Sequence, residues 1–142
     1  MKPIQFFIED VSLNLSHKGK LRTWLTSIAS EYGYEINQLN YIYCSDNYLL
    51  DINKTYLNHD YYTDIITFDQ REDLSNTIEA DIFISIDRVK ENAQEQNLPW
   101  KTEMHRVMIH GLLHLLGFDD KTLALQQEMR KTEDACLSLL QD

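Results

Sequence analysis

Hydrophobic and polar positions along the chain follow two periods, and together they predict a mixture of strands and helices. Short runs rich in β-branched and aromatic residues predict strands at residues 4–8, 39–45, 65–68 and 78–85. Apolar residues three or four positions apart predict helices at residues 16–33, 46–56, 87–97, 103–116 and 123–140. This order favours an α+β fold in which helices flank a small mixed sheet of about four strands.

The ends of several predicted helices carry residues that favour a start or a stop. Ser16, Asp46 and Asp87 precede apolar helical patterns and are expected to cap them. Gly33 and Gly117 follow two of the helices and are suited to end them, because glycine readily adopts the left-handed conformation.

Two further expectations concern packing. The strands at 65–68 and 78–85 flank one polar segment, so we expect them to be neighbours in the sheet or to be joined by a long loop. The last helix is expected to bury a face formed by Leu125, Met129, Thr132, Cys136 and Leu139.

Length and composition fit one globular domain that spans residues 1–142. A chain of this length ordinarily forms a single core, and 43% hydrophobic residues argue against disorder. The longest stretch without Asp, Glu, Lys or Arg runs from 107 to 118, well short of the roughly 18 residues of a membrane span. Cys44 and Cys136 lack a CxxC spacing, which favours thiols in a reducing compartment. We therefore expect a cytoplasmic protein without membrane contact, with a monomer favoured.

The charge balance is acidic and limits the ways in which the chain can bind nucleic acid. Lys and Arg number 13 and Asp and Glu 23, so the net charge is −10, whereas nonspecific nucleic-acid binders usually carry a basic surplus. An RNA-binding role therefore needs a local basic patch or a bound cation. The cluster of His17, Lys18, Lys20 and Arg22 either contacts phosphates or forms an ordinary solvated helix face.

The residues with the clearest chemical meaning lie between positions 110 and 120. His110 and His114 are four apart, so on a helix both imidazoles lie on one face and can bind one cation. Gly117 can end the helix, so that the chain turns back and an oxygen ligand from Asp120 approaches the same cation. Three protein ligands leave a position for water, as in catalytic metal sites. The sequence thus predicts a metal site on a central helix and the loop after it, and the alternative is a pair of hydrogen-bonded core histidines.

The same spacing resembles the HExxHxxGxxH motif of metzincin peptidases, with one difference at the position of the general base. Gly111 stands where those enzymes carry the glutamate that activates water. A peptidase or amidase would need a glutamate from elsewhere, for instance Glu79. A phosphodiester is the better substrate, because a cation can screen the phosphate and lower the pKa of water together.

The segment HGLLHLLGFDD at residues 110–120 resembles the HGxLHLxGYDH motif of the YbeY family of bacterial metal-dependent endoribonucleases. Residues 57–68, 79–85 and 127–129 are similar, in the same order, to the family's T-[DN]-[VI]-L-S-F segment, its G-D-I strand and its E-E-M helix start. The resemblance implies a small mixed sheet surrounded by helices, one zinc ion, and cleavage of single-stranded RNA. It also implies maturation of the 16S rRNA 3′ end and ribosome quality control, with rRNA and the small ribosomal subunit as partners.

The metal ligands implied by the resemblance depart from the family pattern at one position. His110 and His114 match the first two ligands, whereas Asp120 stands where the family usually has a third histidine. A carboxylate is a harder ligand than imidazole, so Mn²⁺ or Fe²⁺ becomes acceptable beside Zn²⁺. Asp119 is the competing ligand, and a degenerate site that has lost its third ligand is the other interpretation.

The remaining candidates surround the predicted metal site. Leu57 occupies the position of a family arginine suited to phosphate, which leaves the substrate-binding residues unassigned. His59 is the nearest candidate for a catalytic role, or an ordinary exposed histidine. Asp64 and Asp81 are candidates to orient a ligand histidine or a water, while His105 points about 140° away from the metal-binding face. A non-enzymatic ribosome-assembly factor with a structural metal is the remaining alternative.

Overall fold

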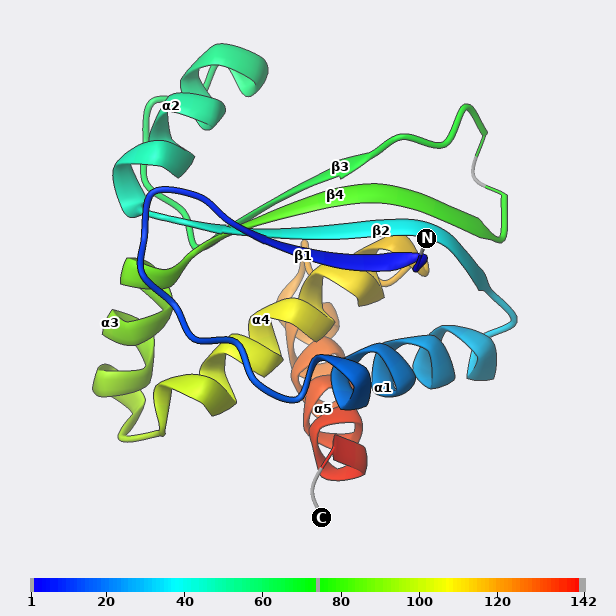
Figure 1. Ribbon diagram of the computed structural model, residues 1–142. Helices are drawn as coiled ribbons and strands as arrows, with labels where there is room; N and C mark the ends of the chain where they lie inside the picture. Colours follow the sequence, from blue (N-terminus) through cyan, green and yellow to red (C-terminus); the bar gives the residue numbers. More distant parts are fainter. Residues whose placement is uncertain (1, 74, 141–142) are drawn as a thin grey trace.

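The computed structural model describes residues 2–73 and 75–140, so Met1, Leu74 and residues 141–142 of the predicted single domain lie outside the described residues. The described part contains a four-stranded sheet and five helices (Figure 1). The strands are β1 (Ile4–Ile8), β2 (Glu35–Cys44), β3 (Ile65–Asp69) and β4 (Thr77–Ser85). The helices are α1 (Lys18–Glu31), α2 (Asp46–Leu57), α3 (Ile86–Gln96), α4 (Trp100–Leu115) and α5 (Leu123–Leu140).

The sheet has the strand order β1-β2-β4-β3, in which β1, β2 and β4 run parallel and β3 runs antiparallel to β4. Parallel neighbours need long connections, and here α1 joins β1 to β2 while α2 and β3 lie between β2 and β4 in the chain. The strands β3 and β4 pair directly, with Ile66 opposite Phe83. These findings confirm the predicted α+β fold with a small mixed sheet.

One face of the sheet carries the main hydrophobic core, because alternate residues of a strand point to the same side. On β4, Ala80 and Ile82 are almost completely buried in a cluster with residues of α1, α4 and α5. These three helices lie together on that side of the sheet (Figure 1). The opposite face is covered at one end by α2, through a smaller cluster that includes Leu49 and Ile66.

Two helices are capped one or two residues earlier than the sequence predicts. Ser45 caps α2 and Ser85 caps α3, in each case through a side-chain oxygen that accepts a hydrogen bond from the third backbone N–H that follows. The expected caps, Asp46 and Asp87, lie in the first turns of α2 and α3 instead. A carboxylate at this position stabilises a helix, because it interacts favourably with the positive end of the helix dipole. Serine and aspartate are about equally good caps, so the choice between near neighbours depends on where the preceding strand ends.

Two other helical details differ from the prediction. The N-cap residue of helix α1 is His17, not the expected Ser16. His17 adopts a left-handed backbone conformation with φ 59°. On α5, Leu125 and Leu139 are 38% and 64% exposed, so they do not form the expected buried face. The buried residues of that helix include Glu133, which is only 4% exposed. A paired carboxylate can replace an apolar side chain on a buried helix face, and hydrophobic periodicity alone does not identify it.

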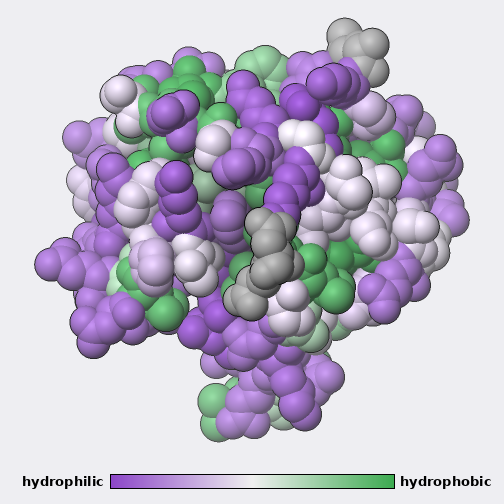
Figure 2. Space-filling model, turned by 60° about the horizontal axis from the view of Figure 1, so that its bottom comes forward, coloured by the Kyte–Doolittle hydropathy of each residue, from purple (hydrophilic) through white to green (hydrophobic). Residues whose placement is uncertain are grey.

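The surface formed by the helices is mostly hydrophilic, with separate hydrophobic patches between the polar side chains (Figure 2). Among the residues that the structure describes, no helix combines the length and the apolar composition that crossing a membrane requires. Cys44 and Cys136 are both buried and free.

Candidate metal centre

Helix α4 carries two histidines at the edge of the hydrophobic core. Ile109, Leu112 and Leu113 are completely buried and hold the helix against its neighbours. His110 and His114 keep 26% and 33% of their side chains exposed, and their ring centroids lie 4.6 Å apart. The spacing of four residues therefore places both imidazoles on one face at the protein surface, as predicted.

Gly117 ends α4 and turns the chain back toward the histidines. Its φ of 99° is left-handed, its N–H donates to the carbonyl oxygen of His114, and the N–H of Phe118 donates to that of Leu113. This pair of hydrogen bonds is the Schellman ending of a helix. The reversal brings the carbonyl oxygen of Phe118 to 3.1 Å from Nδ1 of His114. Because a carbonyl only accepts, Nδ1 carries the proton and Nε2 presents a lone pair.

His110 is held in the same way by a buried carboxylate that sequence reasoning missed. Oε2 of Glu133 lies 2.6 Å from Nδ1 of His110, and Oε1 accepts a hydrogen bond of 3.1 Å from Arg106. Arg106 also donates to Asp134 over 2.6 Å. Burial by itself would lower the pKa of His110, but the hydrogen bond and charge of Glu133, with the charge of Asp120, outweigh it and raise that pKa.

Three ligand atoms converge beyond the end of α4. The Nε2 atoms of His110 and His114 lie 3.0 Å apart, and Oδ2 of Asp120 lies 3.5 and 3.4 Å from them. Ligand atoms about 2.0–2.1 Å from a tetrahedral zinc ion stand roughly 3.3–3.4 Å from one another. With both Nδ1 atoms donating elsewhere, two Nε2 lone pairs and a carboxylate face one point. The predicted group of three could therefore hold a metal ion.

The neighbouring carboxylate, Asp119, has a different role. Its Oδ1 accepts hydrogen bonds from the backbone N–H groups of Asp120 and Lys121, at 2.7 and 3.1 Å. These bonds stabilise the turn that directs Asp120 toward the histidines. The geometry thus brings Asp120, and not the competing Asp119, into the ligand triangle.

A cavity of about 230 Å³ opens beside the triangle, between α4 and α5. Its lining includes His110, Asp120, Asp64 and the exposed Arg130. Burial raises the pKa of Asp64, although the nearby His110 opposes this. Arg130 donates to Gln96 over 3.0 Å. Glu103 and Glu133 also line the cavity, so the guanidinium group of Arg130 lies among carboxylates beside the candidate metal ligands.

The comparisons with known proteins identify the family of this chain. The family model described as Endoribonuclease YbeY matches residues 4–141. This chain belongs to the YbeY family. A protein from Cytophaga hutchinsonii named endoribonuclease YbeY is 57% identical over 136 residues, which cover 96% of this chain and 94% of that protein. One of the same name from Porphyromonas gingivalis is 41% identical over 142 residues, covering 100% and 93%.

A solved structure shows the same fold. The solution structure of TM1509 from Thermotoga maritima has a TM-score of 0.66 and 24% identity, and the match covers 96% of this chain and 88% of that one. At this identity the likeness concerns the fold alone. The resemblance to the YbeY family that the motifs suggested is confirmed by the family model and by the two relatives.

Several residues considered for the YbeY-like site lie elsewhere. His59 lies in the loop after α2, where its ring stacks on Tyr61 and its Nδ1 lies 3.0 Å from the hydroxyl of that residue. It does not line the cavity beside His110. Glu79 and Asp81 project from the face of β4 that points away from α4, and each accepts a hydrogen bond from an asparagine of β2. Of the two aspartates considered, only Asp64 lies in the cavity.

Gly111 shows why a peptidase-like glutamate does not fit this helix. The residue is buried, and a Cβ atom built on it would lie 2.9 Å from Cδ1 of Ile65 and 3.0 Å from Cδ1 of Ile82. Position 111 therefore faces the sheet. A glutamate there would enter the hydrophobic core instead of the metal site.

Proposed function

We propose that this protein is a metal-dependent endoribonuclease that cleaves single-stranded RNA. The observation that carries the proposal is the convergence of His110, His114 and Asp120 beside a cavity with an arginine. The family supports it, because the similar curated proteins are named endoribonucleases. Together these make the chain an RNA-cleaving hydrolase.

The residues around the triangle prepare the site for its ion and its substrate. A divalent cation would supply Lewis acidity toward a phosphodiester and make water a stronger nucleophile. Glu133 and the carbonyl oxygen of Phe118 hold His110 and His114 with Nδ1 protonated, so both Nε2 lone pairs are oriented before the ion binds. Arg130 can bind a phosphate oxygen from the side of α5.

We propose zinc as the metal, with Mn²⁺ or Fe²⁺ accepted as well. Two imidazoles suit zinc, while the carboxylate of Asp120 is a harder ligand that suits Mn²⁺. Neighbouring ligands of an octahedral Mg²⁺ at 2.0–2.1 Å stand roughly 2.8–3.0 Å apart. The two sides that end at Asp120, at 3.4 and 3.5 Å, are wider than this and match a tetrahedral ion, whereas the 3.0 Å side between the two Nε2 atoms fits the octahedral spacing.

We propose rRNA of the small ribosomal subunit as the substrate, with roles in maturing the 16S rRNA 3′ end and in ribosome quality control in the cytoplasm. The YbeY resemblance supports this assignment. A monomer with a net charge of −10 gains little affinity from phosphate neutralisation. Isolated RNA should therefore bind weakly and in a salt-sensitive way, and tight, salt-resistant binding would contradict the proposal.

Two other functions use the same site and are less well supported. A peptidase or amidase lacks support because Gly111 faces the sheet and Glu79 lies on the far face of β4. A non-enzymatic assembly factor would use the same triangle for a structural metal. A peptidase differs from a nuclease in cleaving peptides instead of RNA. An assembly factor differs in that metal removal lowers its melting temperature without abolishing any cleavage activity.

The test combines metal content with cleavage assays. The wild-type protein, purified without chelator, is compared by mass spectrometry with His114→Ala and with His17→Ala, a matched loss of an exposed histidine outside the triangle. We expect about one metal ion per chain in the wild type and His17→Ala, and neither metal nor cleavage of a labelled single-stranded RNA in His114→Ala. A metal-loaded wild type that melts lower without its ion but cleaves no RNA would indicate an assembly factor. Cleavage of unstructured peptides would indicate a peptidase.

A further inference from the structure

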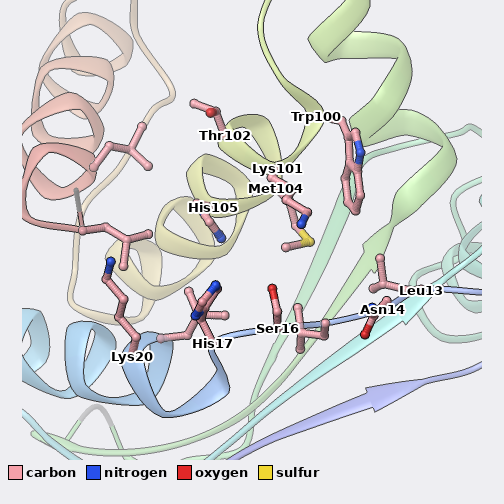
Figure 3. A pocket seen from close by; sticks show the side chains of 14 residues that line it. Leu13, Asn14, Ser16, His17, Lys20, Trp100, Lys101, Thr102, Met104 and His105 are labelled. Carbon is pink, nitrogen blue, oxygen red and sulfur yellow. The ribbon is translucent and has the colours of Figure 1, made fainter. Parts of the chain in front are cut away.

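The two ends of α4 lie in different surroundings. Its first turn borders a cavity of about 410 Å³ whose lining includes Trp100 and His105 (Figure 3). That cavity shares no lining residue with the one beside the candidate metal ligands. The last turn of α4 carries His114 and leads through Gly117 to the loop that holds Asp120. The positions of two of the three candidate ligands therefore depend on how firmly this last turn is held.

One carbonyl oxygen at the end of α4 is bound by a side chain from a distant segment. The last carbonyl oxygens of a helix have no partner within the helix, and here the turn that follows supplies backbone donors to those of Leu113 and His114. No backbone N–H of the described residues donates to the carbonyl oxygen of Leu115. Its donor is Nη2 of Arg71, at 2.8 Å. The end of α4 is therefore tied to the segment between β3 and β4.

Arg71 is itself held in one orientation by two residues near it. Its Nε and Nη2 atoms lie 2.9 and 2.6 Å from the two carboxylate oxygens of Asp69, which makes a bidentate ion pair. Its Nη1 donates to the carbonyl oxygen of Ser75. Only 4% of the Arg71 side chain is exposed, and its hydrogen bond to Asp69 is the main cause that lowers the pKa of that carboxyl. The guanidinium group is therefore a fixed donor beside the end of α4.

The turn that Arg71 contacts carries both ligands that come from this end of α4. Phe118, three residues after Leu115, places its carbonyl oxygen 3.1 Å from Nδ1 of His114 and so orients that ring. Asp120 follows two residues later and presents Oδ2 at 3.4 Å from Nε2 of the same histidine. Because helix ends fray, an unsupported last turn would let Phe118 and Asp120 move relative to His114.

We propose that Arg71 is a positioning residue for the metal site, which keeps the last turn of α4 in place and thereby fixes the distance between His114 and Asp120. The inference rests on the metal binding that the proposed function requires, and not on RNA as the substrate. A guanidinium group repels a nearby divalent cation, so the charge of Arg71 alone would weaken metal binding. Positioning and charge therefore predict opposite effects of removing Arg71, and one measurement separates them.

The test measures Co²⁺ binding to the full-length protein. Competition with a chelator gives the affinity, and the visible spectrum of bound Co²⁺ reports the arrangement of its ligands. Arg71→Met should bind Co²⁺ about tenfold more weakly than the wild type, with an altered spectrum. Tighter or unchanged binding, or an unchanged spectrum, would overturn the proposal.

Arg71→Lys separates the shape of the side chain from its charge. A single ammonium nitrogen cannot replace three guanidinium nitrogens that bind in different directions, so this variant should behave like Arg71→Met. It leaves a cation beside Asp69, and it carries the same prediction if Arg71→Met does not fold. Wild-type Co²⁺ affinity and spectrum in Arg71→Lys would show that the fixed fork is not needed and would overturn the proposal.

The matched control is Arg22→Met. Arg22 also donates to a backbone carbonyl oxygen, at 2.8 Å, but that oxygen belongs to Ile4 of β1. It should bind Co²⁺ like the wild type, and an equal loss in both methionine variants would overturn the assignment to Arg71.

Hydrogen exchange tests the same role without a metal. The amide of Phe118 should exchange faster in metal-free Arg71→Met than in metal-free Arg22→Met, because only the first loses a bond at the end of α4. Equal exchange rates would contradict the role of Arg71. A wild type that binds no Co²⁺ would overturn the proposed function together with this role, whereas unchanged Arg71 variants of a Co²⁺-binding protein would overturn the role of Arg71 alone.

Discussion

Nδ1 of His110 on α4 lies 2.6 Å from Oε2 of Glu133 on α5. The other oxygen of the same carboxylate accepts a hydrogen bond from Arg106, which is 8% exposed and also pairs with Asp134. The edge of α4 that carries the candidate metal ligands is thus joined to α5 by a cluster of charges around the buried Arg106 and Glu133. Because a carboxylate that binds Nδ1 fixes the tautomer and the angle of the ring, the ligand set is ordered before an ion arrives.

Glu133→Gln should weaken metal binding while the protein stays folded. The amide keeps the shape of the side chain but removes the negative charge that fixes His110 and balances Arg106. Loss of such a supporting partner typically costs about 10–100-fold in metal affinity. Competition with a coloured chelator measures the change for zinc.

The matched control for this change is Asp134→Asn. Asp134 also pairs with Arg106, but its side chain is 59% exposed and it does not contact a histidine. We expect metal affinity close to that of the wild type. If both variants lost affinity equally, the effect would belong to the charge cluster as a whole, and the specific role of Glu133 would be wrong.

Changes at the two neighbouring aspartates should separate the ligand from the residue that shapes its turn. Asp120→Ala should lose the metal, whereas Asp119→Ala should keep it and lower the melting temperature, because only backbone N–H bonds are lost. Asp120→His should retain zinc and lose preference for Mn²⁺, since imidazole is a softer ligand than a carboxylate. The measurement is the content of bound metal after dialysis against equal concentrations of Zn²⁺ and Mn²⁺. If Asp120→Ala bound as much metal as the wild type, Asp120 would not be a ligand.

The spatial grouping of the three candidate ligands could be predicted from the sequence because all of its determinants are local. The four-residue spacing of His110 and His114, the left-handed Gly117 and the position of Asp120 all lie within one helix end and its turn. The strand at Ile4–Ile8 was predictable for the same reason, since its pattern lies within five residues. Local periodicity needs no knowledge of how the helices pack.

The support for the triangle could not be predicted, because it depends on the packing of α5 against α4. Glu133 follows the buried Met129 by four residues and precedes the buried Cys136 by three, so it lies on the buried side of α5. That spacing was the available signal. It identifies a buried carboxylate but not its partners, and Arg106 and His110 become known only from the fold.

Gly111→Ala tests how tightly α4 packs on the sheet. The added Cβ would lie 2.9 Å from Cδ1 of Ile65, and overpacking of this kind costs about 1–3 kcal/mol, while replacing glycine in a helix returns about 1 kcal/mol. We expect a net loss of about 1 kcal/mol in the free energy of unfolding. Adding Ile65→Val, which removes the clashing atom, should make the double variant more stable than the sum of the single effects. Urea unfolding measures all three; strict additivity would show that the two residues do not interfere.

We expect His105 to lower the free energy of unfolding in acid. Replacing it by a residue that does not titrate should remove this contribution. Its pKa is lowered to about 4 by burial and by the charges of Lys101 and Lys20, while an unfolded chain has a histidine pKa of about 6.5. The unfolded state therefore binds a proton that the folded state rejects, so this contribution is present above about pH 6.5 and is lost as the pH falls toward 4. His105→Gln cannot titrate, and the difference in unfolding free energy between wild type and variant should shrink over this range. Other acid-sensitive groups are common to both proteins and cancel in the difference, so parallel curves from pH 7.5 to 4 would show that His105 titrates like an exposed histidine.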